Sequence, residues 1–228
     1  FRSSYYGHIG VTTFLLETEG IDVNKPQTVQ GGTRGTPLYA ASQEGHVEVV
    51  KMLLGAEGIK VNESNTEGVT PLIIASQKNY IEIVILFLGV EGIEINKPET
   101  EVGNTPLHVA SIDGHIEIVK ILLGAEGIKV NRSNMHGATP IFMASQKNYI
   151  EIVKLFLGAE GIEINKPETE AGNTPLHAAS IQGHIEIVKI LLDAEGIKVN
   201  KSNMHGATPL LLASVHNHVE IVKLLLGA

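Results

Sequence analysis

The dipeptide Thr-Pro recurs along the whole chain at an almost constant interval. The intervals alternate between 34 and 35 residues, and the dipeptide begins at Thr36, Thr70, Thr105, Thr139, Thr174 and Thr208. Such self-similarity is typical of repeat proteins, in which each unit packs only on its two neighbours. Because every second interval is the same, the duplicated unit is a pair of repeats, 69 residues long.

One unit, the stretch from Asn104 to Asn131, predicts two short helices and an extended exit. Thr105 suits a helix N-cap, because its hydroxyl can accept a backbone hydrogen bond, and Pro106 suits the first helical position. Gly114 ends this helix, and a second helix follows over about residues 115–123. Helices this short are not stable alone, so the units must stack and bury their apolar faces against one another.

Apolar side chains repeat at helical spacing in both predicted helices. We expect the following to face inward: Leu107, Ala110, Ile118, Val119, Leu122 and Leu123. After the second helix, Ile128 to Val130 alternates apolar and polar residues, which predicts a short extended segment. A turn is expected at residues 134–137.

The repeats alternate in two details. Asn replaces the helix-ending glycine in every second repeat, at Asn79, Asn148 and Asn217. The link to the next Thr-Pro is nine residues from Asn165 to Thr174 but eight from Asn200 to Thr208. We therefore predict protruding fingers of alternating length. The first link is longer still, and its sequence GGTRG at 31–35 predicts a flexible tip.

Composition excludes several classes of site and partner. The chain has no Cys, so neither a disulfide nor a thiolate metal site can form. The net charge of −8 argues against a nucleic-acid partner, which requires a basic surface. No apolar run is long enough to cross a bilayer, and residues 1–10 do not resemble a signal peptide, so no membrane insertion is expected.

Ten histidines raise the question of a metal or catalytic site. Four of them stand at the start of a second helix and are better explained by hydrogen bonding in the turn: His8, His46, His115 and His184. A weaker alternative is a zinc site formed by His205, His216 and His218, although no carboxylate or Cys completes it at a recognisable spacing. With no nucleophile elbow and no phosphate-binding loop, we expect no enzyme activity and no cofactor.

Three Asn residues match the acceptor sequence for N-glycosylation: Asn62, Asn131 and Asn200. All three occupy the same position of the repeat, immediately after the extended exit. We interpret them as structural residues that form hydrogen bonds within the hairpin.

The residues GNTPLHVASIDGHIEIVKILL at 103–123, followed by Val-Asn and a hairpin ending in Gly-x-Thr-Pro, resemble the ankyrin repeat. That family carries the signature T-P-L-H-x-A at a period of about 33 residues. The resemblance covers essentially the whole chain. It implies an all-α repeat solenoid of stacked helix-turn-helix units with protruding β-hairpin fingers. We expect one array over 1–228, with a partial repeat at 1–30 and repeats starting near 35, 69, 104, 138, 173 and 207.

The chain departs from the family pattern at identifiable positions. The His of the signature is present only as His108 and His177, so the Thr–His hydrogen bond of the family is expected in two repeats. The other repeats carry Tyr39, Ile73, Phe142 and Leu211 there. The usual hairpin Asp is replaced in the short fingers by Asn65, Asn134 and Asn203. In the long fingers Glu99 and Glu168 lie near this position, in a register that the sequence leaves open.

The resemblance also implies a protein partner, bound on the concave face by finger tips and the exposed side of each first helix. Carried over by position, the expected binding residues are Thr66, Glu67, Gln77, Lys78, Thr100, Glu101, Asn104, Ile112, Asp113, Met135, His136, Gln146, Lys147, Thr169, Glu170, Asn173, Ile181, Gln182, Met204, His205, Val215 and His216. Ile112 and Ile181 are apolar where exposure is expected. Met135 and Met204 provide the adaptable side chains typical of binding surfaces.

Two functions remain open at this point, in addition to the weak enzyme or metal alternative. The first is a non-catalytic scaffold that binds a protein partner, expected to be cytoplasmic and monomeric. The second is a mechanical spacer within a longer repeat protein, which the near-identity of 103–158 and 172–227 favours. Neither end has the polar outer face of a capping repeat, so we expect a fragment of a longer array whose residues 1–30 unfold first.

Overall fold

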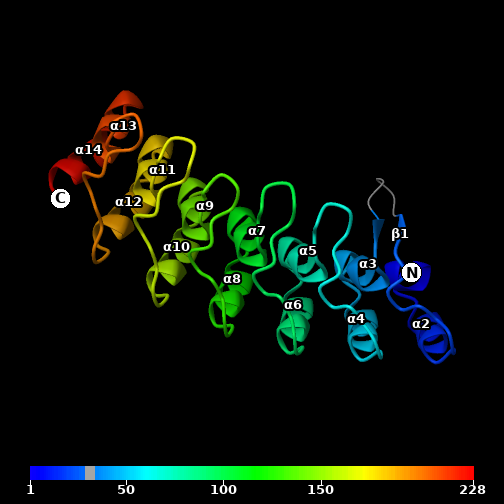
Figure 1. Ribbon diagram of the computed structural model, residues 1–228. Coiled ribbons are helices and arrows are strands. Elements are labelled where there is room, and N and C mark those ends of the chain that lie inside the picture. The colour runs from blue at the N-terminus through cyan, green and yellow to red at the C-terminus, as the bar shows by residue number, and fades with distance from the viewer. Residues whose placement is uncertain (29–33) are drawn as a thin grey trace. The chain divides into compact units, whose positions relative to one another are not determined.

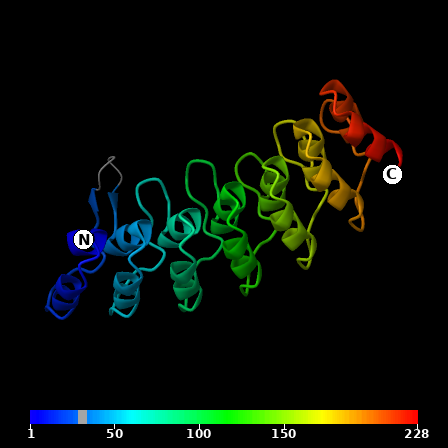
Figure 2. The same ribbon diagram turned by 180° about the vertical axis from the view of Figure 1, so that it is seen from behind.

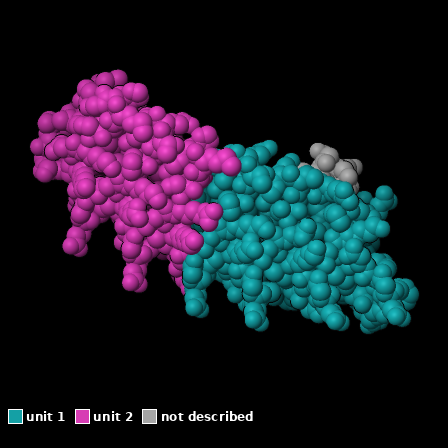
Figure 3. Space-filling model, viewed as in Figure 1, with its two compact units in different colours: residues 1–109, 125–127 teal, residues 110–124, 128–228 magenta. Residues whose placement is uncertain are grey.

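The computed structural model describes residues 1–28 and 34–228, which form a succession of helix pairs (Figures 1 and 2). The chain divides into two compact units, coloured separately in Figure 3. Unit 1 contains Phe1–Val109 with Ala125–Gly127, and unit 2 contains Ala110–Gly124 with Ile128–Ala228. The tip predicted at 31–35 falls mainly on residues 29–33, outside the described residues.

Each repeat contributes a first helix and a second helix. Unit 1 contains α1 (Arg2–Tyr5), α2 (Ile9–Leu16), α3 (Pro37–Glu44), α4 (Val47–Leu54), α5 (Pro71–Gln77) and α6 (Ile81–Leu88). Residues of α7 (Pro106–Asp113) belong to both units. Unit 2 contains α8 (Ile116–Leu123), α9 (Pro140–Gln146), α10 (Ile150–Leu157), α11 (Pro175–Gln182), α12 (Ile185–Leu192), α13 (Pro209–Val215) and α14 (Val219–Leu226).

The first helices begin and end where the sequence predicts. The Thr of Thr-Pro is the N-cap, its hydroxyl accepts from the backbone N–H three residues later, and Pro follows it, as at Thr36, Thr70, Thr139, Thr174 and Thr208. Their ends are left-handed, with φ of 77° at Gly183 and 63° at Asn148. Gly and Asn are the residues that tolerate this conformation best, so the predicted exchange between them is confirmed.

Within each unit, equivalent helices of successive repeats pack against one another. First helices contact first helices, as α9 and α13 both contact α11, and second helices contact second helices, as α10 and α14 both contact α12. The interior between them is aliphatic: Ile187, Val188 and Leu191 are fully buried. Complete burial of such a side chain contributes about 1.5–3 kcal/mol. The predicted all-α fold of stacked helix-turn-helix repeats is confirmed within each unit.

The inward-facing residues predicted for the central repeat are buried, with one exception. Leu107, Ala110, Ile118, Val119 and Leu122 are at most 1% exposed, whereas Leu123 is half-buried. The extended segment predicted at 128–130 is shorter than expected, because a turn already begins at its third residue.

Paired strands occur in only one finger of the described chain. In the first finger β1 (Gln27–Thr28) pairs with β2 (Arg34–Gly35) in an antiparallel ladder. The later fingers are turns and bends. The β-hairpin expected for every finger is therefore found once, because in the others side-chain oxygens bind the backbone N–H groups that a strand ladder would use.

Candidate functional site

Each short finger is held by one asparagine, which is buried in the fingers of Asn65 and Asn134 and half-buried in that of Asn203. Asn134 is 7% exposed, and its Oδ1 accepts from the backbone N–H of His136 at 3.0 Å and of Ala138 at 3.1 Å. The equivalent residues Asn65 and Asn203 accept from the same two positions of their own fingers. The turn predicted at residues 134–137 is confirmed, and its tip presents Met135 and His136 outward.

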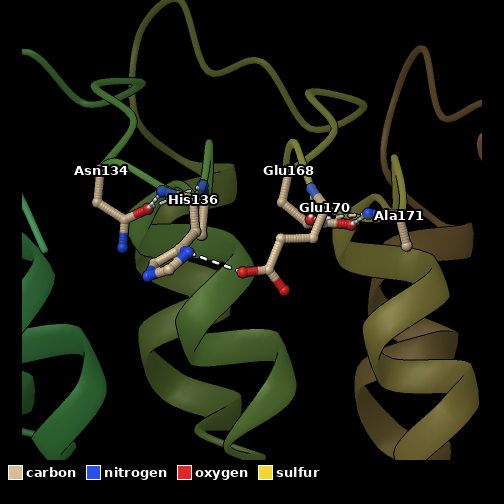
Figure 4. A network of polar contacts seen from close by, with 6 residues as sticks. Asn134, His136, Glu168, Glu170 and Ala171 are labelled. Carbon is tan, nitrogen blue, oxygen red and sulfur yellow. Dashed lines mark hydrogen bonds and ion pairs between the residues drawn. The ribbon is translucent and has the colours of Figure 1, made fainter.

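Each long finger is held by one buried glutamate. Glu168 is 7% exposed, and its carboxylate accepts from the backbone N–H groups of Glu170, Ala171 and Asn173 (Figure 4). Glu99 does the same in its own finger. The glutamate therefore takes the place of the hairpin Asp, which settles the register that the sequence left open. The signal for this role was the sequence Pro-Glu-Thr-Glu, present in both long fingers.

Neighbouring fingers are joined by backbone hydrogen bonds at their tips. In unit 2 the N–H of Thr169 donates to the carbonyl of His136 at 2.8 Å, and that of Met204 donates to Ala171 at 2.8 Å. In unit 1 the N–H of Thr100 donates to the carbonyl of Glu67 at 3.1 Å. Each of these fingers is thus fixed both internally and to the preceding finger.

One side-chain contact joins two finger tips in unit 2. His136 Nδ1 lies 2.7 Å from Glu170 Oε1, and both side chains are largely exposed (Figure 4). At the equivalent places in unit 1 stand two glutamates, Glu67 and Glu101. The tips of the two units therefore differ in charge, although their backbones are held in the same way.

All the residues expected to bind a partner lie at the surface to some degree. Most are exposed, and the half-buried ones are Asn104, Ile112, Gln146, Asn173 and Ile181. The isoleucines thus expose less apolar surface than the sequence suggested. Met135 and Met204, by contrast, are 63% and 65% exposed. The closest contacts among the candidates are those between neighbouring fingers.

The histidines at the start of the second helices join adjacent repeats. The Nε2 atoms of His46, His184 and His218 lie 2.9–3.0 Å from backbone carbonyls at the end of the preceding first helix, those of Tyr5, Gln146 and Ile181. Hydrogen bonding by His46 and His184 is confirmed, but the expected place was wrong: the acceptor lies in the preceding repeat, not in the turn itself.

The alternative zinc site is not assembled. His218 has the structural role just described, and its ring stacks on His216 with centroids 6.1 Å apart. The Nδ1 of His216 lies 2.9 Å from the carbonyl of Leu212. Within 1–28 and 34–228, no three His, Asp or Glu side chains are grouped so that they could hold a metal ion.

Two of the acceptor asparagines for glycosylation have both side-chain atoms in hydrogen bonds. Asn131 Nδ2 donates to the carbonyl of Gly161 at 2.7 Å, and its Oδ1 accepts from the N–H of Glu163 at 2.9 Å. Asn62 forms the same pair of bonds one repeat pair earlier. The structural interpretation holds, but the expected partners were wrong: they lie in the following repeat, not in the hairpin.

The two Thr–His pairs predicted from the family pattern are present. Thr105 Oγ1 lies 2.8 Å from His108 Nδ1, and Thr174 Oγ1 lies 2.8 Å from His177 Nδ1. The His177 ring is fully buried, and its Nε2 lies 3.1 Å from the carbonyl of Ala207. Burial lowers the pKa of His177, against the hydrogen bond to Ala207, which raises it.

No helix in the described part of the chain is long and apolar enough to cross a membrane. A comparison with curated proteins finds no match. The family model described as "Ankyrin repeats (3 copies)" matches residues 1–99, 86–168 and 141–228. Because these matches together span the whole sequence, the chain belongs to the ankyrin-repeat family.

Proposed function

We propose that this chain is a non-catalytic module that binds a protein partner through its finger surface, meaning the finger tips and the exposed ends of the first helices. Ankyrin repeats are generally protein–protein interaction modules. The family alone gives the class of function and leaves open the residues that carry it.

The difference between the internal copies carries the proposal. The long fingers keep Pro-Glu-Thr-Glu in both copies, whereas the short fingers change from Thr66-Glu67 to Met135-His136 and Met204-His205. Side chains that hold the backbone, such as Asn134, are the same in every short finger. Change at the exposed tip together with retention of the anchor is the pattern of a scaffold that presents variable contacts.

The tips have physical properties suited to binding. Their backbone N–H groups are bound by Asn or Glu and by the neighbouring finger, so little conformational entropy remains to be lost on association. The thioether side chains of Met135 and Met204 expose apolar surface that can adapt to a partner's shape. Rigid support under an adaptable contact favours affinity.

The test exchanges one short finger for its internal copy. The double variant Met135→Thr, His136→Glu carries the residues of the 66–67 finger, so the fold should be kept. Proteins captured from a lysate of the source by the wild-type chain are identified by mass spectrometry, purified and measured by calorimetry. We expect the double variant to bind the purified partner about tenfold or more weakly, as for loss of a binding hot spot.

The matched control lies on a second helix, which is not part of the finger surface. Lys154→Ile gives α10 the residue found at the copied position Ile85 of α6, and it should leave partner affinity unchanged. A purified partner that binds the finger variant as tightly as wild type would refute the role of these tips.

The spacer function is favoured by one specific observation, the near-identity of 103–158 and 172–227. A spacer needs uniform repeats and no ligand. It would be supported if no protein is captured reproducibly and if single-molecule extension shows stepwise, reversible unfolding of repeats. Specific capture that depends on the short fingers would exclude it.

A further inference from the structure

Unit 2 contains a cavity of about 480 Å³, lined partly by the turns that follow α10 and α12. These turns lie at the opposite end of each repeat from the fingers (Figure 2). Its apolar lining includes Leu157, Ile162, Ile164 and Ile190, and its charged lining consists of Asp193 and Glu195. The volume lies within the range of about 300–1,000 Å³ usual for ligand sites. The finger surface and this cavity share no residue.

Asp193 departs from the repeat pattern. It occupies the C-cap of α12, where α4, α6, α8 and α10 carry Gly55, Gly89, Gly124 and Gly158, and α2 carries the acidic Glu17. The backbone conformation is the same with either residue, since φ is −76° at Asp193 and −83° at Gly158. A carboxylate at a helix C-terminus faces the negative end of the helix dipole, which is unfavourable unless a cation lies nearby.

The electrostatics of the cavity all have one sign. Its charged lining residues are both acidic, its lining contains no cationic side chain, and Asp193 stands at the C-terminal, negative end of α12. The nearby Lys189 pairs with Glu186 at 3.4 Å. In the described chain, neither Asp193 nor Glu195 takes part in an ion pair or a side-chain hydrogen bond.

We propose that this cavity binds a Lys or Arg side chain of a partner protein. The aliphatic stem packs on Leu157, Ile162 and Ile190, and the cationic head lies between Asp193, Glu195 and the end of α12. Long basic side chains combine these two properties, an apolar stem and a solvated charge. A bare metal ion would leave the apolar lining unused, and a neutral apolar side chain would leave the carboxylates unpaired.

The test uses small probes that differ in one property at a time. N-acetyl-arginine methylamide is titrated into the ¹⁵N-labelled full chain, and backbone amide shifts of Gly161, Ile190 and Ala194 are followed. The citrulline analogue has nearly the same shape without the charge, and the norleucine analogue has only the stem. We expect saturable shifts with the arginine probe and an affinity about fivefold lower for citrulline.

Two variants test whether Asp193 and Glu195 bind the arginine probe. Asp193→Gly introduces the glycine found at the C-cap of α10, and Glu195→Gln removes a charge without changing shape, so each should lower arginine affinity several-fold while the circular dichroism spectrum is kept. The control Glu160→Gln changes the equivalent carboxylate one repeat earlier, outside the cavity lining, and should have no effect. Absence of saturable shifts, equal affinity for citrulline, or loss caused equally by Glu160→Gln would each overturn the proposal.

Discussion

At the scale of single residues, His177 is a buried side chain whose protonation state should affect folding. Its Nδ1 accepts from the backbone N–H of Thr174 at 3.2 Å, and its Nε2 lies 3.1 Å from the carbonyl of Ala207 and so must donate. Only the neutral ring protonated on Nε2 satisfies both contacts. A second proton would remove the acceptor and place a charge in a fully buried position.

This arrangement predicts a dependence of stability on pH. Burial lowers the pKa of His177 from its ordinary value of 6.5. Above about pH 6.5 the ring is neutral in both the folded and unfolded chain and contributes no pH dependence. Below it the unfolded chain takes up the proton first, so the free energy of unfolding falls as pH decreases from 6.5 toward the lowered folded-state pKa.

The measurement is urea denaturation at pH 7.5 and at pH 5.5. His177→Leu, which introduces the residue found at the equivalent Leu211, should lose less stability than wild type between these pH values. His205→Leu, at an exposed finger tip, should change as wild type does. Equal losses in wild type and His177→Leu would show that this ring does not carry the effect.

At the scale of elements, the short and the long fingers differ in the side chain that binds their backbone N–H groups. A short finger turns about an asparagine, whereas a long finger, with one more residue, turns about a glutamate, whose side chain is one methylene longer. The carboxylate accepts from three backbone N–H groups, compared with two for the amide of Asn134. The anchor's length and its number of acceptor positions therefore match the length of the finger.

Removal of the long-finger anchor should destabilise the chain. Glu168→Ala leaves three backbone donors without their acceptor, and we expect a loss of about 2 kcal/mol in the free energy of unfolding, measured by urea denaturation. Glu170→Ala is the control, because this exposed side chain pairs only with His136, and its loss should stay within about 0.5 kcal/mol. Equal effects of the two substitutions would contradict the anchoring role of Glu168.

The glycines that end the first helices have a second role besides the left-handed turn. A Cβ on Gly114 would lie 2.7 Å from the ring of Tyr149 in the next repeat, so the glycine makes room for that ring as well as for the left-handed turn. Gly183 makes room for a histidine ring in the same way, because a Cβ there would lie 2.7 Å from the ring of His218.

At the scale of the whole molecule, repeats depend on their neighbours for stability, and the N-terminal helices have little cover. In unit 1, α1 is four residues long, and Val11 and Phe14 of α2 are 52% and 70% exposed. The residue of α12 equivalent to Val11 is Ile187, which is fully buried. Less buried apolar area means a lower free energy of local opening.

Hydrogen exchange should therefore reveal an order of opening. We expect amides of residues 1–28 in the 228-residue chain to exchange fastest, and amides of α5 and α6 in the same unit to be protected longest. Mass spectrometry of peptic fragments after timed deuteration provides the measurement. Protection of α2 equal to that of α6 would refute this expectation.

The sequence by itself determined the repeat and the helix limits, whereas the Thr–His pairs were expected from the resemblance to the family. The repeat and the helix limits depend on residues a few positions apart and on a burial pattern that recurs with the helical period, so they can be derived locally. The histidines at the second helices, such as His184, could likewise be assigned to hydrogen bonding from their position, although not to a particular acceptor.

Only the tertiary structure decided what each side chain meets across a repeat boundary. It showed that Asn131 bonds to the following repeat, that Glu168 anchors the long finger, that Ile181 is half-buried, and that Asp193 lines a cavity. These facts depend on distances between residues that lie about 30 positions apart or on the path of a turn. Periodicity fixes which face of a helix is buried, but the position of the neighbouring repeat determines the contacts that this face makes.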